Sequence, residues 1–164
     1  MSPGTLFDGS RIVLDAMIII NFHGLLMLDK IVSWSPREIV IEKRVRKEAQ
    51  YSTNGVIALA PYIEKGLVIE EEIEGKEQED LFYYYKNRQV GKARIHEPDA
   101  ACLALAISKG YGLASNERVI LEEFRSRYPG KPCFSAWDIV TKAQRLGFIS
   151  EKEAGDLKVG ICYL

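Results

Sequence analysis

The fold can be inferred outward from one apolar segment near the N-terminus, Ile12-Val13-Leu14-Asp15-Ala16-Met17-Ile18-Ile19-Ile20. A short apolar run rich in Val and Ile is typical of a strand that is covered on both faces of a sheet. Asp15 interrupts this run. Burying an unpaired carboxylate is costly, so we expect Asp15 to be exposed at a strand end, paired, or bound to a metal ion. In parallel sheets, ligand sites lie beyond the carboxyl ends of the strands, and Asp15 is placed to form one wall of such a site.

The composition is that of one domain with its own core. The chain has 164 residues, of which 47% are hydrophobic, and this suits a single domain of ordinary size. Its 22 Lys and Arg nearly balance 23 Asp and Glu, so only a local basic patch could indicate nucleic acid. Cys102, Cys133 and Cys162 have no paired spacing, which predicts a reduced protein without a zinc site.

The N-terminal segment gives no indication of targeting or of a membrane. The first ten residues have no basic segment, and the apolar run that follows is interrupted by Asp15. This argues against a signal peptide, and no stretch approaches the length of a membrane span. We therefore expect a cytoplasmic protein with no membrane partner.

Strand-like and helix-like segments alternate along the chain. Strands are expected at about 11–18, 38–42, 67–69, 111–114 and 133–134. Helices are expected at about 21–32, 43–51, 56–65, 77–89, 99–109 and 117–127, and from a capping box at Ser135 to about 145. This alternation predicts an α/β fold, a three-layer α/β/α sandwich with a central, mainly parallel sheet.

We divide the chain into an N-terminal extension (1–10), the α/β domain (11–145) and a C-terminal extension (146–164). The C-terminal extension has a second capping box at Ser150 and ends in the apolar segment 159–164. We expect a helix that begins at Ser150, and the apolar segment after it must bury its side chains, so we expect this segment to pack on its own domain as an added edge strand. The alternative is an interface with a second copy or with a segment of another protein.

Four acidic residues fall at comparable points of the expected elements: Asp15, Glu48, Asp99 and Glu117. Right-handed parallel crossovers would bring these strand ends and helix starts to one edge of the sheet. Carboxylates that share a pocket repel each other and raise each other's pKa. A bound Mg²⁺ or Mn²⁺ relieves that repulsion, and it can activate a water and stabilise the charge that develops on a phosphodiester.

Each acid also has a purely structural explanation. Asp15 could accept a backbone N–H at a strand end, and Asp99 could simply stabilise a first helical turn. We favour the ligand role for both. Glu48 could be a solvated helix residue near Arg44, and Glu117 a first-turn residue behind a cap, so both explanations stay open for these two.

Four segments carry these acids in a particular order: 12–15 (IVLD), 45–48 (VRKE), 98–106 (PDAACLALA) and 113–118 (LASNER). Their order and spacing resemble the PIN-domain family of metal-dependent ribonucleases over about residues 11–145. The resemblance implies that Asp15, Glu48, Asp99 and Glu117 hold Mg²⁺ or Mn²⁺, and that Ser115 helps to hold a carboxylate or a water. It implies hydrolysis of RNA by a metal-activated water.

Two positions depart from the usual pattern of that family. Glu117 stands where the family usually has Asp, and Met17 stands where it often has Asn or Ser. A thioether cannot hydrogen-bond a metal-bound water as an amide or hydroxyl does. These departures favour the alternative function, a PIN-fold RNA-binding or assembly module that is catalytically weak or inactive.

Basic residues near the acids are the candidates for RNA contact. Such runs are usually solvated faces, but phosphates would be held here if both basic segments border the acidic pocket. The candidates are Arg44, Lys47, Lys92 and Arg94.

The resemblance also suggests partners. Small single-domain PIN proteins are similar to the toxins of prokaryotic toxin–antitoxin pairs, which implies a homodimer and a small antitoxin protein that blocks it. The function expected from the sequence is thus a Mg²⁺- or Mn²⁺-dependent endoribonuclease, with the toxin role as a finer expectation.

Overall fold

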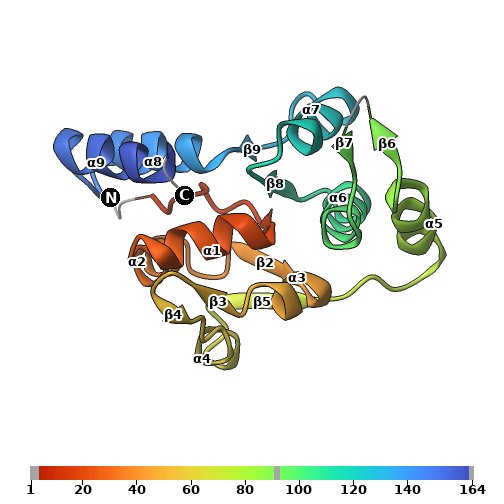
Figure 1. The fold of residues 1–164 in the computed structure, drawn as a ribbon, viewed down its shortest axis with the longest axis horizontal. Coiled ribbons are helices and arrows are strands. Elements are labelled where there is room, and N and C mark those ends of the chain that lie inside the picture. Colours follow the sequence, from red (N-terminus) through yellow and green to blue (C-terminus); the bar gives the residue numbers. More distant parts are fainter. Residues whose placement is uncertain (1–3, 91–92, 163–164) are drawn as a thin grey trace.

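The computed structural model describes residues 4–90 and 93–162, and in this part of the chain five parallel strands form the central sheet (Figure 1). The strands follow the order β5-β2-β1-β8-β9, and every neighbouring pair is parallel. Their bounds are β1 Ile12–Leu14, β2 Ile39–Glu42, β5 Val68–Glu71, β8 Gly112–Ala114 and β9 Cys133–Phe134. Two short antiparallel hairpins lie outside this sheet: β3 Tyr51–Ser52 with β4 Gly55–Val56, and β6 Gln89–Val90 with β7 Ala93–Arg94.

Helices cover both faces of the sheet. The bounds are α1 Ala16–Gly24, α2 Leu28–Trp34, α3 Lys43–Glu48, α4 Ala60–Glu64, α5 Lys76–Tyr85, α6 Glu97–Lys109, α7 Arg118–Arg127, α8 Ala136–Arg145 and α9 Glu151–Cys162. Figure 1 shows α1, α2, α8 and α9 on one side of the strands and α5 and α6 on the other. The predicted α/β fold with a central parallel sheet between helical layers is therefore confirmed.

Helix α6 is the buried centre of its layer. It packs across β1, β2 and β8 and is covered in turn by α5. Every residue from Ala100 to Ile107 is buried, because a helix that lies between a sheet and another helix has no solvent face. Pro98 lies in its first turn, and Gly110 ends it in the left-handed conformation (φ 71°).

The first strand is shorter than the sequence predicted. It ends at Leu14, and α1 begins at Ala16 rather than near residue 21. Asp15 is therefore the N-cap of α1 rather than a strand residue, and its side chain accepts the N–H of Ile18. A short apolar run is compatible with both a buried strand and a buried helix, and here one such run contains both. The predicted helix at 21–32 is also two helices, which are separated at Leu26, where φ is 61°.

The C-terminal extension forms the helix expected after Ser150, but residues 159–162 continue this helix instead of forming the edge strand that we expected. Ser150 and Glu153 form the predicted capping box, because each side chain bonds the other's backbone N–H. Helix α9 then continues to Cys162 and packs on α8. The capping box fixes a helical start, and α8 gives the half-buried side chains of α9 a place to pack without pairing at the sheet edge. Residues 163–164 of the apolar segment lie outside the described residues.

In the described part of the chain, no single helix is long and apolar enough to cross a membrane. Only α1 and α2 taken together reach that length and composition, and they are bent by 114° at the break between them.

Gly112 is a position where the close pairing of strands tolerates no side chain. A Cβ added there would lie 2.5 Å from Cδ1 of Ile12 and 2.7 Å from the backbone oxygen of Pro132. The backbone oxygen cannot move aside as a flexible side chain can. Gly112→Ala should therefore lower the free energy of unfolding by about 1–3 kcal/mol, measured by urea denaturation. Gly130→Ala is the control, because a Cβ at Gly130 meets no atom within 4 Å.

Candidate functional site

Asp15 is held in place at the junction of two neighbouring strands. It follows β1, and Ser115 follows β8, the strand paired with β1. Oδ1 of Asp15 accepts the N–H of Ile18 at 2.8 Å, and Oδ2 accepts the hydroxyl of Ser115 at 2.6 Å and the N–H of Asn116 at 3.3 Å. Ser115, the predicted helper, is fully buried and also accepts the N–H of Glu117 at 3.0 Å. These bonds fix the orientation of the Asp15 carboxylate.

Asp99 lies in the first turn of α6 and shares the electrostatic environment of the other three acids. Burial raises the pKa of Asp99 to about 7, and the charges of Asp15, Glu117 and Glu48 add to the shift. Such repulsion requires the carboxylates to be near one another in a poorly screened place. Asp15, Glu117 and Glu48 thus lie within electrostatic reach of Asp99.

The pKa of Asp15 is also raised above its ordinary value. Burial is the main cause, and the charge of Glu117 adds to it, while the hydrogen bonds from Ser115, Ile18 and Asn116 act in the opposite direction. The two glutamates differ from the two aspartates in exposure. Glu48 ends α3 and Glu117 is the N-cap residue of α7, and both are exposed. The site therefore has a buried Asp15, a half-buried Asp99 and a glutamate rim.

The donor chemistry of the four acids fits Mg²⁺ or Mn²⁺, but the side chains are not arranged as a finished coordination sphere. Within residues 4–90 and 93–162, no three or more His, Cys, Asp or Glu side chains lie so that they could hold a metal ion together. Oδ1 of Asp15 accepts only one hydrogen bond and has a lone pair left. Glu48 and Glu117 are exposed, and their carboxylate oxygens are ligands of the type that hard cations prefer.

This acidic edge gives the strongest indication of chemistry in the described structure. A scan against models of known protein families, a search of curated proteins and a search of solved structures each found no match. Function must therefore be inferred from the side chains themselves.

Cys102 lies directly beneath the acids and is not a candidate nucleophile. Its Sγ is completely buried and donates to the backbone oxygen of Leu14 at 3.8 Å. Burial raises the pKa of this thiol, and the charges of Asp15 and Asp99 raise it further. A thiol that stays protonated is a packing residue.

Sequence reasoning missed Glu42, whose side chain is fully buried at the N-cap of α3. It accepts the N–H of Arg44 at 2.7 Å and the guanidinium of Arg44 at 2.7 Å. Arg44 also bonds Glu97 at 3.1 Å and lies over the ring of Phe82. A Glu directly before a charged helix was the available signal, since acidic residues favour helix N-termini. Arg44, predicted to contact RNA, is thus already engaged in holding α3 to α6 and α5.

The other predicted RNA-contacting residues differ in their surroundings. Lys47 is exposed on α3 and Arg94 is exposed on β7, and neither forms an ion pair with another described residue. Lys92 lies outside the described residues. Lys47 is next to Glu48 in the chain, so a free cation adjoins the acidic rim.

Proposed function

We propose that the protein is a Mg²⁺- or Mn²⁺-dependent ribonuclease with a PIN-like domain that hydrolyses RNA phosphodiester bonds. The observation that carries the proposal is the position of Asp15 at the carboxyl ends of the paired strands β1 and β8, where Ser115 orients it. Asp99 lies within electrostatic reach of Asp15, and its pKa is raised to about 7 by burial and by the charges of Asp15, Glu117 and Glu48. Acids placed in this way gain stability when a divalent cation binds. The order of the four sequence segments supports the same function.

In this proposal each residue has a distinct task. Asp15 and Asp99 would hold the cation, and Glu48 and Glu117 would complete its coordination from the rim. Ser115 would keep Asp15 oriented through the 2.6 Å hydrogen bond. A divalent cation, when bound, supplies a water of lowered pKa and neutralises charge on the phosphate. Neither histidine is assigned as a base, because a cation that lowers the pKa of its bound water would supply the nucleophile.

A second candidate function is an RNA-binding or assembly module without catalysis. The observation that favours it is Met17, which is 41% exposed in the first turn of α1, two residues after Asp15. A thioether there offers no hydrogen bond to a water near the acids. The toxin role, the antitoxin and the homodimer that the resemblance implies remain predictions of the sequence.

Metal dependence tests the proposed function. A single-stranded RNA with a fluorophore and a quencher should be cleaved in millimolar Mn²⁺ or Mg²⁺ and left intact in EDTA, because the carboxylates alone cannot activate water. Calorimetric titration should show Mn²⁺ binding to the same preparation.

The outcomes separate the two candidate functions. Cleavage that continues undiminished in EDTA contradicts the metal mechanism. A protein that binds RNA but neither binds Mn²⁺ at millimolar concentration nor cleaves is the binding module instead.

A further inference from the structure

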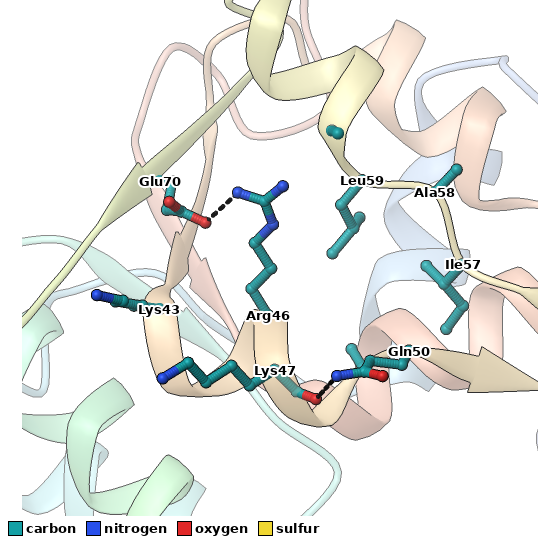
Figure 2. Close-up of a pocket in the computed structure, with 10 residues that line it drawn as sticks. Lys43, Arg46, Lys47, Gln50, Ile57, Ala58, Leu59 and Glu70 are labelled. Atoms are coloured by element: carbon teal, nitrogen blue, oxygen red, sulfur yellow. Dashed lines mark hydrogen bonds and ion pairs between the residues drawn. The ribbon is translucent and has the colours of Figure 1, made fainter.

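A cavity of about 430 Å³ lies between α3 and the segment that leads into α4 (Figure 2). Its volume is within the range of roughly 300–1,000 Å³ that is usual for sites of small ligands. Ile57 and Leu59 form an apolar wall on one side, and Lys43, Arg46 and Lys47 line the side of α3. We call it the α3–α4 cavity.

The α3–α4 cavity combines an apolar wall with an excess of positive charge. Three cations line it and are opposed by one acid, Glu70. A cavity at the end of β5 has the reverse character, with four glutamates (Glu70, Glu71, Glu72 and Glu74) and a single lysine, Lys109. The charge of the α3–α4 cavity is thus a local property, and it favours an anionic ligand.

Two of the three cations are available to such a ligand. Arg46 donates to Glu70 at 2.7 Å, so its charge is largely compensated. Lys43 is paired with Glu72 at 3.5 Å, but both side chains are more than half exposed, and exposed pairs of this kind contribute little. Lys47 forms no ion pair within the described residues. We therefore infer that Lys47 and Lys43 are the residues that bind the negative charge of the ligand.

A second cavity lies on α3 between the α3–α4 cavity and the start of α6, the helix that carries Asp99. This cavity, of about 490 Å³, shares Lys43 and Lys47 as lining residues and reaches Pro98, the neighbour of Asp99 in the chain. Glu48 of the acidic rim directly follows Lys47. A polyanion that leaves the acidic edge along α3 would thus pass Lys47 and enter the α3–α4 cavity.

We propose that the α3–α4 cavity is a subsite for one nucleotide of a single-stranded RNA. In the RNA, this nucleotide flanks the phosphate that is held at the acidic edge. The base lies against Ile57 and Leu59, and the backbone phosphate lies at Lys47 and Lys43. An apolar face for the base and cations for the backbone are what sequence-tolerant single-strand binding requires. This subsite rests on the proposed function, because it takes the same RNA as the acidic edge.

Ala58→Trp tests the subsite by filling it. Ala58 lines the cavity and is exposed, so an indole there takes up space without disturbing the core. Thr141→Trp is the matched control, because Thr141 is also exposed and belongs to α8, which lies apart from α3 and α4 in Figure 1. Fluorescence anisotropy with a labelled 12-nucleotide RNA in EDTA should show about tenfold weaker binding for Ala58→Trp. Thr141→Trp should bind as the wild-type protein does.

Photocrosslinking locates the bound base independently. RNA that carries 4-thiouridine should crosslink to the tryptic peptide 48–65, which contains Gln50, Ile57 and Leu59. Ala58→Trp should lose that crosslink and keep the one to peptide 95–109, which contains Asp99. Circular dichroism of both tryptophan variants verifies that they are folded.

The results distinguish failure of the subsite from failure of the proposed function. If Ala58→Trp binds RNA with the wild-type affinity while the wild-type protein cleaves RNA with Mn²⁺, the subsite is wrong and the ribonuclease stands. The α3–α4 cavity would then suit an acidic peptide instead. If the wild-type protein crosslinks through peptide 48–65 but does not cleave, the subsite stands and the nuclease is wrong. Absence of any RNA binding overturns both.

Discussion

Asp15→Asn and Asp99→Asn should each reduce metal-dependent RNA cleavage by roughly 10²–10³-fold. The amide has the size of the carboxylate but no charge, so a divalent cation loses one of the two aspartate ligands that the proposal assigns to it. Asn is also a good N-cap and can still accept the N–H of Ile18, which keeps α1 intact. Initial cleavage rates in Mn²⁺ and thermal unfolding of each variant measure the two effects separately.

The matched control is Asp156→Asn, an exposed Asp on α9, which should cleave as the wild-type protein does. Glu48→Gln and Glu117→Gln distinguish a metal-ligand role of each glutamate from a purely structural role. Cleavage should fall only if the replaced glutamate is a metal ligand. Wild-type rates in both aspartate variants would contradict the assignment of the site. Loss of Mn²⁺ affinity in the same variants would support it without reference to cleavage.

In the absence of metal, Asp99 should make the protein less stable as the pH rises. The pKa of Asp99 is about 7 in the folded protein, against an ordinary value of 3.8. Between these values the folded state holds a proton that the unfolded state has released, so the free energy of unfolding falls with rising pH. The stabilisation is fully present below about pH 4 and is lost once the pH has risen through 7.

Comparison with Asp99→Asn isolates this contribution from that of the other acids. In EDTA at pH 8, the variant should unfold at a higher temperature than the wild-type protein, by several degrees. The difference should shrink toward pH 4, where both side chains are neutral. Mn²⁺ at pH 8 should then raise the unfolding temperature of the wild-type protein more than that of the variant. Parallel pH profiles in EDTA would show that Asp99 is not in the repulsive environment described.

The elements that could be predicted from the amino-acid order are those whose ends carry local signals. The capping boxes at Ser135 and Ser150 start α8 and α9 where predicted, because each box is closed by side chains only three residues apart. The apolar run in α6 and the glycine that ends it could also be predicted, because both signals lie within the helix or directly after it. The alternation of these elements was enough to predict the fold class, and the positions of the four acids relative to them were enough to nominate a site.

Tertiary structure alone decided where the first strand stops and what several charged groups do. Ser115 is 100 residues from Asp15 in the chain, and the hydrogen bond between them exists only because β1 and β8 are paired. Arg44 is held by Glu97, 53 residues away, and so is less free than its sequence neighbours suggested. The raised pKa of Asp99 and the α3–α4 cavity likewise depend on residues that are distant in sequence. Burial, repulsion between charges and cavity walls are properties of neighbours in space, which the order of residues along the chain does not specify.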